Sequence, residues 1–422
     1  MKHLRRILRF IFFLNFVLLV AIGAMWATWH VLEGGPRISP KLSDVVIELA
    51  TLPSKAYHYI FDGGQMAAWH INDDTTTTQV YREAKGIAQV KILISTYEDE
   101  SNLKVSLTSI GTNKIFKTWR VNIPELSDKL KFLKIPATAW APAIQHPFML
   151  KDSSIVFIAD GLFKVDKNNK LELLNADIKY HHTIEDENDS IFWICASKRV
   201  AIEPSPRDTT LVEDVIAGYN IKTNRVFHIK SIRDALTESG YGAMFRGPGV
   251  SPNDRFHIND IQPVKVKSKF WEIGDLFVSV RHLSTIFLYR PSTQKIIWLK
   301  QGPWLSQHDV DVVDEKMISV FNNDVLRAGE GDKSVQGYNK VLYYDFKSDS
   351  ISSPYTSIFK KLKINTIAEG RCDLLPNGDL YVDEANNAKL YILNKDSLKW
   401  RYIERVDKRL IKRFNWPRLI SN

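Results

Sequence analysis

Hydrophobic and polar residues alternate along the chain in a pattern that recurs six times. Each copy consists of two short alternating stretches around a polar turn, as in "TIFLYRPSTQKIIWL". Period-two alternation around such a turn is typical of a β-hairpin. The copies lie at residues 105–119, 161–174, 217–229, 285–299, 341–355 and 389–403. They therefore follow one another at intervals of roughly 50 to 70 residues.

One further hydrophobic strand precedes several of these hairpins, at residues 274–280, 315–321 and 378–384. Each unit thus offers three or four strands, and repeated units of this kind are the signature of a β-propeller. Alternating strands also fit a large β-sandwich, but six similar hairpins at near-even spacing favour the propeller. We predict an all-β chain with a six-bladed β-propeller at residues 56–405 and a short helix within residues 231–242.

The N-terminal segment predicts a membrane anchor. Residues 10–29, "FIFFLNFVLLVAIGAMWATW", carry no charge and have the length that crosses a bilayer. Basic residues precede them, which keeps the N-terminus in the cytoplasm. We predict a single N-terminal transmembrane helix at residues 1–30, a stalk at residues 31–55, and an inner-membrane, single-pass protein with its propeller in the periplasm. A cleaved signal peptide is the alternative, although Met25 and Trp26 crowd the candidate cleavage position.

The net charge of +9 is concentrated at the two ends of the sequence. Residues 1–9 hold four Lys or Arg side chains, and residues 401–422 hold seven basic and two acidic ones. Nucleic-acid binding usually needs a basic face on the folded domain, so we expect no nucleic-acid partner. The basic C-terminal tail at residues 406–422 could contact anionic lipid headgroups or be a solvated end.

The chain has two cysteines, Cys195 and Cys372. In an exported protein they could pair as a disulfide. Two buried free thiols are the alternative, and the sequence leaves both open because geometry decides which forms. Neither cysteine has the spacing of a zinc site.

Polar side chains open the hydrophobic strands of several units. The first strand of each propeller blade lines the central axis, so residues that open these strands should meet at one mouth of the channel. Arg281, at the end of the strand at 274–280, should join them. The candidates are His181, His182, His257, Asn259, His308, Asp309 and Arg371.

This set of residues allows three kinds of site. A histidine cluster can bind a transition metal, with carboxylates such as Asp260 and Asp309 beside it. It can bind an anion, with Arg281 as a planar donor to sulfate, phosphate or carboxylate oxygens. One imidazole can instead act as a nucleophile while the others stabilise charge. Arg281 and Asn259 favour an anion, so we predict no metal and no cofactor. Trp304 lies close to His308 in sequence and could stack on an aryl substrate.

At these residues the sequence resembles the bacterial arylsulfotransferase (arylsulfate sulfotransferase) family. The resemblance covers about residues 60–400 and is carried by "HHTIEDENDSIFWI", "FHINDIQPV", "GDLFVSVRHLSTIFLY", "QHDVDVVDEKMISVFNND" and "CDLLPNGDLYVDEANNAKLYIL". It implies a six-bladed propeller with its site at the channel mouth. It also implies transfer of a sulfuryl group from an aryl sulfate to a phenolic acceptor, through a sulfohistidine and without a nucleotide sulfate donor.

The resemblance implies a role for each matching residue. His308 would be the nucleophile, and His257, Asn259 and Arg281 would hold the sulfate oxygens. His182 would contact the sulfate or protonate the leaving phenoxide, with His181 the less certain of that pair. Asp309 could orient His308, or be a solvated charge at a strand edge.

The sequence departs from the family pattern in ways that leave alternatives open. Thr183 follows the double histidine where an acidic residue is expected, and the spacings between motifs are short. With a membrane anchor, the acceptor could be a glycan or a lipid-linked molecule rather than a phenol. A non-catalytic envelope propeller that binds an anionic or aromatic ligand, or a partner protein, is the main alternative. A quinone-cofactor dehydrogenase is not supported, because the sequence shows neither the tryptophan-docking repeats nor the calcium site of that class. The oligomeric state is left open.

Overall fold

A computed structural model describes most of the C-terminal part of the chain. The chain divides into two compact units, Met1–Met66 and Ala67–Asn422. The described residues are Gly23, 69–71, 78–80, 87, 89–131, 133, 142–201, 210–246, 254–328, 331–406 and 410–420. The predicted anchor and stalk lie outside these residues, apart from Gly23. Among the described residues, no helix has the length and hydrophobicity to cross a membrane.

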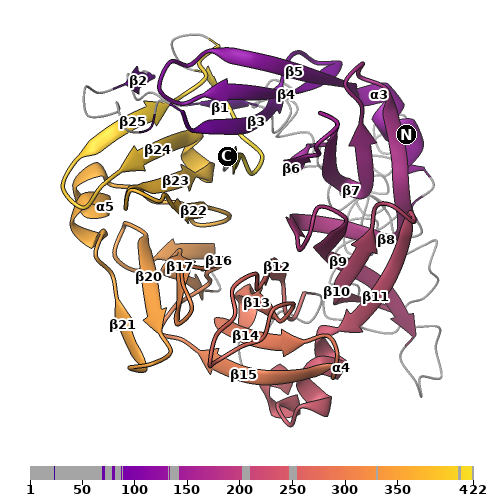
Figure 1. The fold of residues 1–422 in the computed structure, drawn as a ribbon, viewed down its shortest axis with the longest axis vertical. Coiled ribbons are helices and arrows are strands. Elements are labelled where there is room, and N and C mark those ends of the chain that lie inside the picture. Colours follow the sequence, from indigo (N-terminus) through magenta and orange to yellow (C-terminus); the bar gives the residue numbers. More distant parts are fainter. Residues whose placement is uncertain are drawn as a thin grey trace, which may run out of the picture. The chain divides into compact units, whose positions relative to one another are not determined.

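Four antiparallel sheets of four or five strands surround a common centre within the unit Ala67–Asn422 (Figure 1). The first contains β27 (Arg418–Ile420), β3 (Lys91–Tyr97), β4 (Asn102–Ser109) and β5 (Ile115–Asn122). The second contains β12 (Ile258–Pro263), β13 (Leu276–Val280), β14 (Thr285–Arg290) and β15 (Lys295–Gln301). The third contains β16 (His308–Val312), β17 (Met317–Asn322), β20 (Lys340–Asp345) and β21 (Ser350–Ser352). The fourth contains β22 (Arg371–Leu374), β23 (Leu380–Glu384), β24 (Lys389–Leu393), β25 (Leu398–Tyr402) and β2 (Gln79–Val80).

The remaining strands form one large sheet and two small ones. The large sheet has six strands in the order of the chain: β6 (Gln145–Met149), β7 (Ile155–Val165), β8 (Leu171–Asp186), β9 (Ile191–Ala201), β10 (Thr210–Asn220) and β11 (Arg225–Ser231). The small sheets pair β1 (Trp69–Ile71) with β26 (Leu410–Lys412), and β18 (Val325–Ala328) with β19 (Gly331–Ser334). The described part of the chain is thus a propeller-like, all-β arrangement.

The prediction of six separate blades is wrong in its number, because four blades are present beside the six-stranded sheet. The reason is the length of β8, which has 16 residues. Its first part, Leu171 to Asn175, pairs with β7, its last part, Ile184 to Asp186, pairs with β9, and Tyr180 between them pairs with both. One continuous strand therefore belongs to both halves of the sheet and prevents a break between them.

The alternating sequence pattern predicted the hairpins correctly. The hairpins β4–β5, β7–β8, β10–β11, β14–β15, β20–β21 and β24–β25 are all antiparallel pairs at the predicted places. The strands predicted ahead of three hairpins are β13, β17 and β23. The predicted helix is α4 (Ile232–Glu238), whose first turn is capped by the Ser231 side chain. The other helices are short: α3 (Ile123–Leu130), α5 (Thr356–Leu362), and the 3-10 turns η2 (Gly242–Arg246), η3 (Arg281–Leu283) and η4 (Ala385–Asn387).

Hydrophobic cores lie between neighbouring sheets. One core joins Phe277 and Ile286 of the second blade to Val310 and Ile318 of the third. Burying a large apolar side chain contributes about 1.5 to 3 kcal/mol, so these contacts hold the sheets face to face. Both cysteines are buried and free, which excludes the disulfide alternative.

The C-terminal segment completes the first blade. Strand β27 pairs antiparallel with β3, so Arg418 lies opposite Leu93 and Ile420 opposite Lys91. Within the segment expected from the sequence to be a basic tail, residues 410–420 therefore contribute β26 and β27 to the folded unit.

Candidate functional site

Three of the predicted site residues stand where an innermost strand begins. His308 is the first residue of β16, Arg371 is the first residue of β22, and His257 directly precedes β12. The prediction that they open such strands is confirmed. At two of these strands, a carboxylate on the preceding sheet accepts a hydrogen bond from a backbone N–H near the first residue of the strand. Asp260 Oδ2 accepts from Val310 N at 2.8 Å, and Asp309 Oδ2 accepts from Cys372 N at 2.7 Å.

The double histidine is placed differently from the prediction. His181 and His182 lie inside β8 rather than ahead of a strand. The pairing of β8 with β9 is interrupted between Tyr180 and Ile184, and His182 has a φ of 62°. This left-handed backbone takes the two imidazoles out of the regular ladder.

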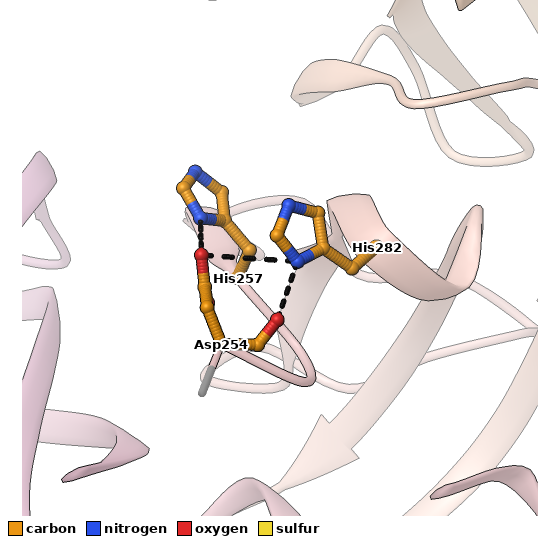
Figure 2. Close-up of side chains that lie close together, drawn as sticks. All are labelled: Asp254, His257 and His282. Carbon is orange, nitrogen blue, oxygen red and sulfur yellow. Dashed lines mark hydrogen bonds and ion pairs between the residues drawn. The ribbon is translucent and has the colours of Figure 1, made fainter. Parts of the chain in front are cut away.

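Four imidazoles lie in contact with one another. His181 and His182 approach to 2.7 Å between their Nδ1 atoms. The rings of His182 and His257 meet edge to face, with centroids 4.9 Å apart. The rings of His257 and His282 are stacked at 4.5 Å (Figure 2). We call these four residues the histidine cluster.

Asp254 holds the two stacked histidines from one side (Figure 2). Its Oδ2 lies 2.7 Å from Nδ1 of His257, and its backbone oxygen accepts from Nδ1 of His282 at 2.6 Å. Burial opposes ionisation of this carboxyl, but the hydrogen bond and charge of His257 lower the pKa of Asp254 to about 2. Asp254 is therefore a carboxylate that orients His257.

The ligand atoms of Asp254, His257 and His282 lie close enough together to suggest a metal site. Both Nδ1 atoms already bond to Asp254. Arg281 Nη1 lies 3.2 Å from Nε2 of His282, so a permanent positive charge lies beside the ring nitrogen of His282 that does not bond to Asp254. A divalent cation would be repelled there. The arrangement suits an anion better than a metal.

His308 is buried, with 1% of its surface exposed. Its Nδ1 lies 2.7 Å from Oδ1 of Asn323, and its Nε2 accepts the backbone N–H of Glu369 at 3.1 Å. Burial lowers the pKa of His308 well below its usual value, and the charge of Arg281 lowers it further. The imidazole is therefore neutral near pH 7 and carries its lone pair on Nε2.

His182 lies within the electrostatic reach of the other candidates. Burial lowers the pKa of His182 well below its usual value, and His181, His257, His308 and Arg281 lower it further. The structure therefore brings predicted residues of β8, η3 and β16, and His257 just before β12, into one neighbourhood.

Arg281 contributes the positive charge of this site. Its side chain is 5% exposed, and Nη2 lies 3.2 Å both from Oδ2 of Asp332 and from the backbone oxygen of Ile367. The guanidinium is thus oriented by one partly exposed carboxylate and one carbonyl. Planar donors of this kind match the oxygens of a sulfate or phosphate group.

Arg371 and Asp309 form a second charged network. Arg371 Nη2 lies 2.8 Å from Oδ1 of Asp309 and 3.3 Å from Oε1 of Glu185, and Nη1 lies 3.1 Å from Nδ1 of His146. Arg418 joins through Glu185, at 2.9 Å. We call these five residues the arginine–carboxylate network. From the sequence, Asp309 was expected to orient His308 or to be a solvated charge. The side chain that bonds to Nδ1 of His308 is Asn323, and the buried Asp309 binds Arg371.

Two further candidates have roles in packing. The Asn259 side chain donates to the backbone oxygen of Gln307 at 2.8 Å, and so holds the chain just before His308. Trp304 is 1% exposed and lies in the core between the second and third blades, with its ring edge toward Tyr344. The structure does not bring Trp304 into the histidine cluster.

Several residues of the site were missed by the sequence reasoning. Trp416 lies between the two groups: its ring is 5.4 Å from that of His182, 6.4 Å from that of His308, and 5.4 Å from Cζ of Arg371. Its place in the C-terminal basic segment gave no signal. Asn323 follows a predicted strand in "FNND", and His282 follows Arg281 directly, so both had weak signals in the sequence.

Two solved structures are distantly similar to this chain. A protein of unknown function from Bacteroides caccae is 12% identical, with a TM-score of 0.47 over 79% of this chain and 100% of that one. A nidogen–laminin complex is 8% identical, with a TM-score of 0.43 over 79% of this chain and 98% of the other. No argument about function follows from either.

Comparison with known sequences is more informative. No curated protein matches the chain. The model of a protein family described as arylsulfotransferase (ASST) matches residues 146–405. This range contains the histidine cluster, Arg281, His308 and Arg371. The chain belongs to the arylsulfotransferase family.

Proposed function

We propose that this protein is a sulfotransferase that uses His308 as its nucleophile. It would move a sulfuryl group from an aryl sulfate to a phenolic or other hydroxyl acceptor, without a nucleotide donor. Membership of the arylsulfotransferase family supports sulfuryl transfer in general. The state of His308 is the observation that carries the finer proposal.

The buried imidazole of His308 has the properties that a nucleophile needs. Its lowered pKa keeps it neutral, and Nε2 carries the lone pair. A histidine nucleophile must be unprotonated on its attacking nitrogen. Arg281 and the imidazoles nearby would stabilise the charge of a sulfate group during transfer.

The proposed reaction has two balanced steps. In the first, Nε2 forms a bond to sulfur while the bond from sulfur to the phenolic oxygen breaks, and the phenolate leaves. In the second, the acceptor oxygen attacks sulfur, the N–S bond breaks, and the electron pair returns to Nε2. The proton of the acceptor hydroxyl ends on the phenolate, so the enzyme is unchanged.

The neighbouring side chains have separate tasks in this proposal. Arg281 would hold two sulfuryl oxygens, because its planar donors fit them. His257, which donates from Nδ1 to Asp254, would in its doubly protonated form donate from Nε2 to a sulfuryl oxygen. His182 would carry the proton between the acceptor and the leaving phenolate. Asn259 would hold the backbone before His308, since its amide already bonds to Gln307.

Access to His308 requires the loop that contains Ile367 and Glu369 to move. The backbone N–H of Glu369 occupies Nε2 of His308, and the backbone oxygen of Ile367 occupies Nη2 of Arg281. We propose that the donor replaces both groups, with a sulfuryl oxygen in place of the Ile367 carbonyl.

The test is the capture of the intermediate. The full-length protein in detergent would receive an aryl sulfate that releases a coloured phenol, and intact mass would be measured after a rapid quench. We expect one added sulfuryl group on the parent and none on His308→Ala. The control is His228→Ala, because His228 bonds to the Tyr289 hydroxyl at 3.1 Å, outside the cluster. Binding of the aryl sulfate without phenol release or adduct would favour a non-catalytic binding protein.

We also propose that residues 1–30 anchor the protein in the inner membrane with the propeller in the periplasm, as we predicted from the sequence. An anchored enzyme would meet envelope glycans as well as phenols. Fractionation of cells with and without residues 1–30, followed by protease treatment of spheroplasts, tests the location. Recovery of the full-length protein in the cytosolic fraction would oppose it.

A further inference from the structure

Asn323 makes contacts that fix which end of its amide faces His308. Its Nδ2 donates to the backbone oxygens of Thr366, at 3.0 Å, and Glu369, at 2.7 Å. An amide nitrogen has two N–H donors, and both are used by these carbonyls. The remaining atom, Oδ1, is an acceptor and lies 2.7 Å from His308 Nδ1. His308 must therefore donate to Asn323 through an Nδ1–H.

We propose that Asn323 is the positioning residue of His308: it holds the proton on Nδ1, so that the lone pair on Nε2 faces the sulfuryl donor. This inference rests on the proposed function. Asn323 is fully buried, as is His308 apart from 1%, so water does not compete for this hydrogen bond.

A neutral acceptor suits this role better than a carboxylate. An aspartate at the same place would favour the protonated imidazolium, which has no free lone pair. The carboxylate next to His308 in sequence, Asp309, is instead bonded to Arg371 and to Cys372 N. The structure thus places an amide, and no carboxylate, at Nδ1 of His308.

The same amide serves the step in which charge develops. When Nε2 bonds to sulfur and the phenolate leaves, the ring becomes positively charged while Nδ1 keeps its proton. The hydrogen bond from Nδ1 to Asn323 Oδ1 then becomes charge-assisted and stronger. When the acceptor oxygen takes the sulfuryl group, the N–S bond breaks and the ring returns to its neutral form.

The chain offers a matched control at Asn339. Its Nδ2 donates to the backbone oxygens of Asn323, at 2.8 Å, and Thr366, at 3.0 Å, and its Oδ1 accepts from Thr366 N at 2.7 Å. Asn339 is also fully buried, and like Asn323 it supports the loop that contains Thr366. It has no hydrogen bond to the His308 side chain among those of the described residues. Loss of Asn339 therefore perturbs the loop without removing the acceptor at Nδ1.

The experiment compares Asn323→Ala, Asn323→Asp and Asn339→Ala in the full-length protein. Single-turnover phenol release would be followed from pH 5 to 9. We expect Asn323→Ala to slow it about 100-fold. Asn323→Asp should move the acid limb of the profile to higher pH by one unit or more, because its carboxylate raises the pKa of His308. In Asn339→Ala the acid limb should stay where it is in the parent. An unshifted limb in a cooperatively folded Asn323→Asp, or the same shift in Asn339→Ala, would overturn the proposal.

A second readout separates this inference from the proposed function. Nitrogen NMR of histidine-labelled protein distinguishes the two tautomers without any turnover, with His308 assigned through His308→Gln. We expect a protonated Nδ1 in the parent and a mixture in Asn323→Ala. If the parent transfers no sulfuryl group but shows this change, the proposed reaction fails and the positioning role stands. If the tautomer is the same in both proteins, the positioning role fails.

Discussion

The two arginines near the centre of the propeller are surrounded by different partners. Arg281 faces imidazoles, a carbonyl oxygen and the partly exposed Asp332. Arg371 faces the buried carboxylates of Asp309 and Glu185. Arg281 is 5% exposed and Arg371 is 4% exposed, so burial does not distinguish the two residues.

The difference in partners is the reason why we propose different roles for the two regions. In the arginine–carboxylate network the charge of Arg371 is paired with the buried carboxylates of Asp309 and Glu185. These ion pairs connect sheets that are distant in sequence. Beside the histidine cluster Arg281 faces an imidazole and one partly exposed carboxylate, so its charge is available to an incoming anion. The following variants test this difference, in order of decreasing expected effect.

The largest contrast should be between two buried histidines, one from each region. His308→Ala should lower the rate of phenol release by a factor of 10³ or more, because the nucleophile is lost. His146→Ala should chiefly lower stability, since His146 accepts from Arg371 and Arg418 in the network. Single-turnover kinetics and urea unfolding of both variants test this. A similar loss of rate in a folded His146→Ala would remove the distinction.

The two arginines should divide activity from stability. Arg281→Ala should slow transfer by about 10² to 10³-fold, as when a donor to a developing charge is removed. Arg371→Ala leaves the buried Asp309 without its charged partner and Glu185 with Arg418 alone, which should cost about 3 to 5 kcal/mol of unfolding free energy. Denaturant midpoints and rates measured on both proteins compare the effects. Equal loss of stability in the two variants would contradict the assignment.

The two regions should respond to pH in opposite directions. The pKa values of His182 and His308 are lowered by burial, so below about pH 6.5 the unfolded state binds more protons and stability falls as pH drops. Burial raises the pKa of Asp260, beside the network, to about 6. Between about pH 4 and 6 the folded state therefore binds more protons at Asp260, and this contribution to stability is lost as pH rises.

Asp260→Asn separates these contributions, because an asparagine oxygen can still accept from Val310 N. Unfolding free energies of the parent and this variant would be measured from pH 4 to 8. Between about pH 4 and 6, stability should increase with pH more steeply in Asp260→Asn than in the parent, by an amount on the order of a few kcal/mol over the window. Parallel curves for the two proteins would show that Asp260 does not titrate there.

The smallest contrast should be between two buried tryptophans. Trp416→Phe should reduce the transfer rate a few-fold, because Trp416 contacts the rings of His182 and His308. Trp304→Phe should leave the rate unchanged and cost about 1 to 2 kcal/mol, because Trp304 lies in the core. Steady-state kinetics and thermal melts measure both. A change in rate in Trp304→Phe alone would restore the stacking role expected from the sequence.

Local sequence was enough to predict the six hairpins and three of the residues that open innermost strands. Alternation with a period of two is a local property, so the six hairpins and the strands ahead of three of them were predictable. His257, His308 and Arg371 were found at strand starts because each stands just before an apolar stretch. The number of blades was not predictable in this way, because the continuity of β8 depends on its pairing with β7 and β9.

Only the tertiary structure decided how the polar side chains are paired. Asp309 is adjacent to His308 in sequence but binds Arg371, and Asn323, 15 residues away, binds His308. Trp304 was favoured by its closeness in sequence, yet Trp416 from the end of the chain packs against the histidines. The contact of Asp309 with Arg371 joins two sheets, whereas Asn323 meets His308 across the β16–β17 hairpin. A local pattern indicates which side chains are buried, while the ring that brings the sheets together determines which of them meet.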